Sequence, residues 1–137
     1  MKNEFVESAW PCHVPDRMMD EPYLVFDFAD ITKKIKAETQ WIKGDRNALT
    51  LLKNESMSIV LICLKSRAEI NFHHSGKLAS AQILVGAADF IMNGNTAPLK
   101  SGGLLTLHEQ VEHKLIALEE SVILLTMTVH PVADTAY

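Results

Sequence analysis

The sequence has 137 residues, of which 47% are hydrophobic and 22% charged, and its formal net charge is -4 at pH 7. These values are typical of one globular domain, and the acidic balance excludes the basic face that nucleic-acid binding requires. The longest apolar runs, 59–64 and 122–125, are far shorter than a membrane span, and the charged N-terminus predicts no signal peptide. We therefore expect a soluble protein with neither a nucleic-acid nor a membrane partner.

The first part of the chain predicts little regular structure. Residues 1–20 show no periodicity and contain two prolines, which predicts an extended or partly disordered arm. We accordingly divide the chain into an arm, 1–20, and a β-barrel domain, 21–137. The β-branched and aromatic run 23–28 predicts a strand. Asp30 is a candidate N-cap for one or two helical turns over 30–38.

From Trp41 onward, strands of about five to eight residues alternate with turn signals, which is typical of an all-β sandwich or barrel. Asn93-Gly94 is the strongest hairpin signal, because both residues tolerate positive φ. Segment 57–65 is apolar on both alternating faces and should be a central strand with both sides covered. The expected strands are 48–53, 57–65, 70–74, 80–85, 89–92, 104–107, 113–118 and 122–129.

The spacing of histidines and glycines between residues 70 and 113 resembles the two motifs of the cupin superfamily, in its small RmlC-like form. Counting back from Gly86, His73 falls on the first histidine of motif one, Ser75 on the second and Ala79 on the glutamate. The run from Gly102 to His113 fits the second motif. The resemblance covers roughly residues 23–129. It implies a double-stranded β-helix, or jelly-roll barrel, with a short N-terminal arm and room for one short helix.

The resemblance also implies where a ligand would bind. A metal-competent cupin pocket offers three histidines and a glutamate, and this chain keeps two of the four, His73 and His113. Two imidazoles hold Fe, Mn, Ni or Zn only weakly without a third ligand. Gln82 does not replace the glutamate, because alternation puts it on the other face. Ser75 and Ala79 leave room and apolar surface, which favours an uncharged or weakly polar small molecule hydrogen-bonded to the histidines.

Three interpretations of His73 and His113 stay open: two hydrogen-bonded barrel histidines with no ligand, a metal site, or a metal-free binding or acid/base site. The matching functions are a small-molecule binder, our preferred prediction, a metal-dependent enzyme of the oxygenase or isomerase type, and a structural or regulatory interaction module. The superfamily includes all these classes, so the fold alone does not decide between them.

Cysteine content and apolar excess give two further expectations. Two cysteines, Cys12 and Cys63, are too few for a disulfide framework and favour a reduced, cytoplasmic setting. Cys63 should be a small buried hydrophobic residue. The strands 57–65 and 122–129 carry more apolar residues than one barrel interior needs, which predicts a homodimer.

Overall fold

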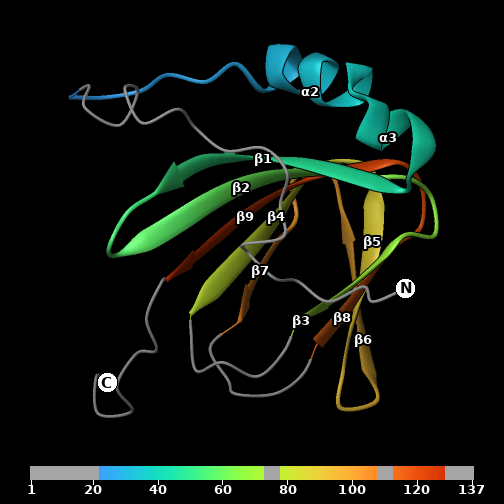
Figure 1. The fold of residues 1–137 in the computed structure, drawn as a ribbon. Helices are drawn as coiled ribbons and strands as arrows, with labels where there is room; N and C mark the ends of the chain where they lie inside the picture. Colours follow the sequence, from blue (N-terminus) through green and yellow to red (C-terminus); the bar gives the residue numbers. More distant parts are fainter. Residues whose placement is uncertain (1–21, 73–77, 108–112, 129–137) are drawn as a thin grey trace.

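The computed structural model describes residues 22–72, 78–107 and 113–128, which form two helices and nine strands (Figure 1). The strands make two antiparallel sheets, one in the order β1-β2-β9-β4-β7 and one in the order β3-β8-β5-β6. This is a two-sheet jelly roll, so the predicted fold class is confirmed. The elements are α2 Phe28–Ala37, α3 Thr39–Lys43, β1 Arg46–Lys53, β2 Met57–Leu64, β3 Glu69–Phe72, β4 Ala79–Val85, β5 Ala87–Met92, β6 Asn95–Lys100, β7 Leu104–Leu107, β8 His113–Ala117 and β9 Ser121–Thr128.

The main core lies between the two sheets. Because side chains alternate along a strand, each sheet turns every second residue toward the other sheet. Val60, Ile62 and Leu64 of β2 point inward from the five-stranded sheet, and Leu115 and Ala117 of β8 belong to the same buried cluster. We call the space between the sheets the interior.

A second core lies on the outer face of the five-stranded sheet, where α2 and α3 cover β1 and β2 (Figure 1). Leu61 and Cys63 point outward into this core and meet Ile31, Ile35 and Trp41 of the helices. The prediction that this strand is central and covered on both faces is confirmed, as is the burial of Cys63. Burial raises the pKa of the Cys63 thiol to about 11. The chain's own helices thus cover much of the apolar excess from which we predicted a homodimer, and that prediction is not tested by the fold.

The helices correct the sequence analysis. Residues 23–27 form no strand, and the helix begins at Phe28 because the Asp27 carboxylate accepts hydrogen bonds from the amides of Ala29 and Asp30, at 2.9 and 3.3 Å. Asp30 is therefore inside the helix rather than its cap. Trp41 lies in α3, against the expectation that strands begin there. Within the described ranges, no helix has the length and apolar character needed to cross a membrane.

The sequence analysis also missed β6, which follows the Asn93-Gly94 turn. Pro98 removes one backbone donor, which argues against a central strand but not against an edge strand. β6 lies at the edge of the four-stranded sheet and pairs with β5 alone among the described strands.

Asn47 links α2 to the five-stranded sheet by hydrogen bonds. Its side chain is fully buried on β1, and its amide nitrogen donates to the Ile35 carbonyl at 3.0 Å and to the Glu38 carboxylate at 2.7 Å. We expect Asn47→Ala to lower the free energy of unfolding by about 2–3 kcal/mol, because it removes two hydrogen bonds that a fully buried amide donates, one of them to a carboxylate. Urea unfolding of this variant beside the exposed control Asn95→Ala measures the effect. A loss equal to that of the control would mean that apolar contacts alone hold the helices.

Candidate ligand site at one end of the barrel

Four strand ends meet at one end of the two sheets. Only residues 73–77 separate β3 from Leu78, and only residues 108–112 separate β7 from β8. Stretches of this length reach at most about 20 Å. The ends of β3 and β8 on one sheet and of β4 and β7 on the other therefore lie at the same end of the barrel (Figure 1). We call this end the mouth.

His113 is the first residue of β8 and lies at the mouth, where its side chain points into the interior. It is 6% exposed and alternates with Leu115 and Ala117 of the main core, while Lys114 between them is exposed. The backbone of His113 is in register with Phe72, the last residue of β3. The structure thus places one imidazole inside the barrel, at its open end, on the four-stranded sheet.

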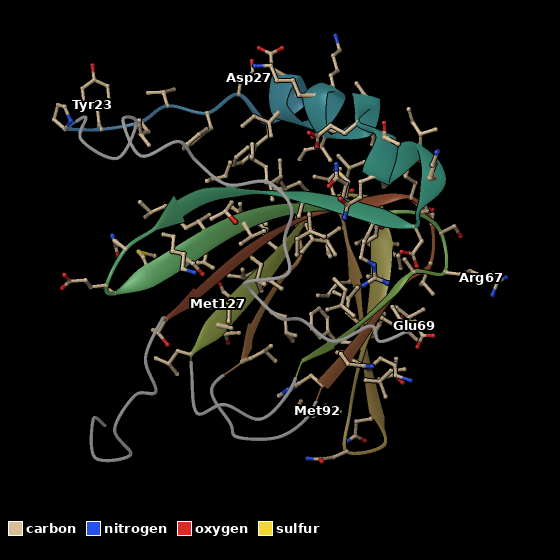
Figure 2. All side chains as sticks on the ribbon, viewed as in Figure 1. Tyr23, Asp27, Arg67, Glu69, Met92 and Met127 are labelled. Atoms are coloured by element: carbon tan, nitrogen blue, oxygen red, sulfur yellow. The ribbon has the colours of Figure 1, made fainter. Side chains whose placement is uncertain are left out.

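The five-stranded sheet supplies the opposite wall of the mouth. Its first inward row runs across four strands, since Met127 is in register with both Ser58 and Ala79, and Ala79 is in register with Leu107. Ser58 and Leu107 are buried, and Ala79 and Met127 pack against the main core. Figure 2 labels Met127 on this wall and Met92 on the four-stranded sheet. The four residues of this row are uncharged, and the largest of their side chains are apolar. At the sheet edge, the exposed Lys53 of β1 is in register with Ser58.

The structure brings two of the four predicted site residues, His113 and Ala79, to the interior of the mouth on opposite sheets. The other two, His73 and Ser75, lie outside the described residues. Among the residues that are described, no three His, Cys, Asp or Glu side chains gather closely enough to hold a metal ion. The described part of the mouth therefore does not form a metal centre by itself, and metal binding by His73 and His113 stays a prediction.

Gln82 lies where alternation predicts. It sits between Ala81 and Ile83, both fully buried in the main core, and is itself only partly buried. Its side chain therefore belongs to the outer face of β4 and does not reach the interior.

A hollow of about 300 Å³ lies at the mouth end of the five-stranded sheet. Three inward residues, Ala79, Leu107 and Met127, border it together with neighbours that alternate to the outer face. None of its side chains is charged, so the hollow suits apolar or weakly polar groups. The lining residues are Met57, Leu78, Ala79, Ser80, Thr106, Leu107, Thr126, Met127 and Thr128.

The described residues form a small jelly-roll barrel in which the buried His113 imidazole on one sheet faces a largely apolar row on the other. No protein-family model matches the sequence, and no curated protein matches it. Solved structures do match, and they include proteins described as cupins. The chain therefore has the cupin fold, of the RmlC-like type.

Three of these structures show how widely the matching proteins differ in identity, coverage and described function. An RmlC-like cupin from Shewanella frigidimarina is 18% identical with a TM-score of 0.57, covering 68% of this chain and 82% of its own. A protein of unknown function from Streptococcus pyogenes is 24% identical with a TM-score of 0.60, covering 82% of this chain and 92% of its own. Salicylate 1,2-dioxygenase from Pseudoaminobacter salicylatoxidans is 13% identical with a TM-score of 0.64, covering 74% of this chain but only 34% of its own. Identities this low show a shared fold and carry no activity across.

Proposed function

We propose that this protein binds a small neutral or weakly polar molecule inside the mouth of its barrel. The observation that supports this proposal is a buried, inward-facing imidazole opposite a largely apolar row of side chains on β2, β9, β4 and β7. Ala79 lies in that row at the position where the family motif carries a glutamate. A carboxylate there would favour a cation, whereas a methyl group leaves apolar surface for the body of a ligand.

His113 would orient the ligand. A neutral imidazole has one ring nitrogen that donates and one that accepts, so it can bind a hydroxyl, a carbonyl or an amide. Its place at the end of a strand, on a rigid sheet, fixes the direction of that hydrogen bond. The apolar residues of the facing wall, Met127 and Leu107, would contact the remainder of the molecule.

Thermal unfolding of metal-free protein against a library of small metabolites tests the proposal. A ligand present at 100 times its Kd adds about 2.7 kcal/mol to the stability of the folded state, which raises the midpoint by several degrees. We expect one chemical class to raise it and the rise to be lost in His113→Ala. Lys114→Ala is the matched control, because its side chain is exposed on the other face of β8. A rise that survives in His113→Ala would exclude the histidine from the site.

A metal-dependent enzyme of the oxygenase or isomerase type is the second candidate, because the inward-facing His113 is one of the two imidazoles that such a site would use. Elemental analysis of protein purified without a histidine tag decides between the two. Near-stoichiometric Fe, Mn, Ni or Zn, lost in the His73→Ala/His113→Ala double variant, would favour the enzyme. Protein with neither metal nor ligand response would favour a structural or regulatory module.

A further inference from the structure

Ser58 presents a buried hydroxyl at the mouth. The residue is 0% exposed, and its Oγ atom makes no hydrogen bond in the part of the chain that the structure describes. Its register partners are Met127 on β9 and Lys53 on β1, and Lys53 is exposed at the sheet edge.

The side chain of Ser58 belongs to the interior. It precedes Val60 and Ile62 by two and four residues, and both of these are in the main core. The register between β2 and β9 runs without a bulge from Met57 to Leu64, so no irregularity turns Ser58 to the other face. Three residues of the inward row, Met127, Ala79 and Leu107, have no side-chain group that forms a strong hydrogen bond. The exposed Lys53, in register with Ser58 on the edge strand β1, makes no hydrogen bond to its Oγ atom.

Another serine of the same sheet shows how such a group is normally satisfied. Ser121 is also 0% exposed, and its Oγ lies 2.8 Å from the Glu119 carbonyl oxygen and 3.2 Å from the Ala87 carbonyl oxygen, two acceptors that share its one hydroxyl proton. Buried polar groups nearly always have partners, because an unpaired one loses its hydration without compensation. The described residues therefore provide no hydrogen-bond partner for the Ser58 hydroxyl, and a bound molecule is the candidate for that partner.

We infer that Ser58 Oγ is the polar contact for the ligand on the five-stranded wall. The ligand class is then a neutral molecule with an apolar body and a hydroxyl or carbonyl group, since a serine hydroxyl both donates and accepts. The inference rests on the proposed function, and it adds a second polar contact, on the sheet opposite His113.

The first test needs no ligand and compares Ser58→Ala with Ser121→Ala by thermal unfolding. Ser121→Ala should lower the midpoint by about 3 °C or more, because it removes a hydroxyl with two partners. Ser58→Ala should leave the midpoint unchanged or raise it, because it removes a hydroxyl that has no partner to lose. An equal fall in both variants would show that Ser58 has a structural hydrogen bond, and would overturn the inference.

The second test uses phenol and toluene, which have similar shapes but carry a hydroxyl and a methyl group, respectively. The protein is labelled with ¹³C-methyl methionine. Phenol should shift the Met127 methyl signal, assigned through Met127→Leu, and Ser58→Ala should weaken phenol binding by about three- to tenfold without affecting toluene. If phenol bound equally to both proteins, Ser58 would not be the contact, although the proposed function would stand. If neither probe moved the Met127 or Met92 signals, the mouth would not be a site, and both proposals would fail.

Discussion

Gly86→Ala is expected to lower the free energy of unfolding by about 2–5 kcal/mol, a large part of the stability of a domain this size. Gly86 joins β4 to β5 with φ +97°, a region that L-residues enter only at a cost. A Cβ atom there would lie 2.4 Å from Ser121 Oγ and 2.6 Å from the Glu120 carbonyl oxygen. Both strain and overlap therefore oppose the substitution, and urea unfolding measures their sum.

Gly94→Ala separates the two causes. Gly94 also has positive φ, +78°, but no described atom lies within 4 Å of its Cβ position. It should therefore lose only the strain, about 1–2 kcal/mol. Equal losses at both glycines would mean that the Ser121 turn moves aside without cost, and that the close approach at Gly86 is not important for stability.

Leu61→Ala and Ile62→Ala should each lower the free energy of unfolding by about 2–5 kcal/mol, although the two residues point to opposite faces of β2. Ile62 is 1% exposed in the interior, and Leu61 is 0% exposed beneath the helices. In a sheet with one solvated face, one of two adjacent substitutions would be nearly neutral. Here both create cavities, because both faces are covered.

Chemical unfolding of the two variants and of Leu118→Ala checks this prediction. Leu118 is 53% exposed, so its truncation should cost less than about 0.5 kcal/mol. A Leu61→Ala loss as small as that of Leu118→Ala would contradict the packing of α2 and α3 on the barrel.

The strands could be predicted from the sequence wherever an apolar or β-branched run is bounded by turn residues. β2 and β9 were located to within one residue at each end, because both of their faces are apolar and turns bound them. The predicted strand at 23–28 was wrong. Aromatic residues also suit an extended segment that packs on a sheet without pairing with it. There Asp27 decides the structure, since its carboxylate caps the helix that follows. Local propensity does not reveal which of two candidate caps is used.

The site was only partly predictable. Motif spacing singled out His113 and Ala79, and both lie on inward-facing rows at the mouth, on opposite sheets. Ser58 was missed, since a lone serine at the start of an apolar strand matches no motif. A signal was nevertheless present: Ser58 has the same parity as Val60 and Ile62, so it belongs to the row that faces the interior. The predicted homodimer relied on apolar outer faces, and sequence periodicity does not show that α2 and α3 cover much of them.

The strand order β1-β2-β9-β4-β7 has a consequence for the path by which the chain assembles. β9, the last described strand, lies between β2 and β4. Until β9 has been synthesised, the edge of β2 that it will pair with has no partner, and this edge is rich in aliphatic side chains. Such edges are templates for wrong pairing, so a nascent chain of this protein should be prone to misassociation until β9 emerges and pairs with β2.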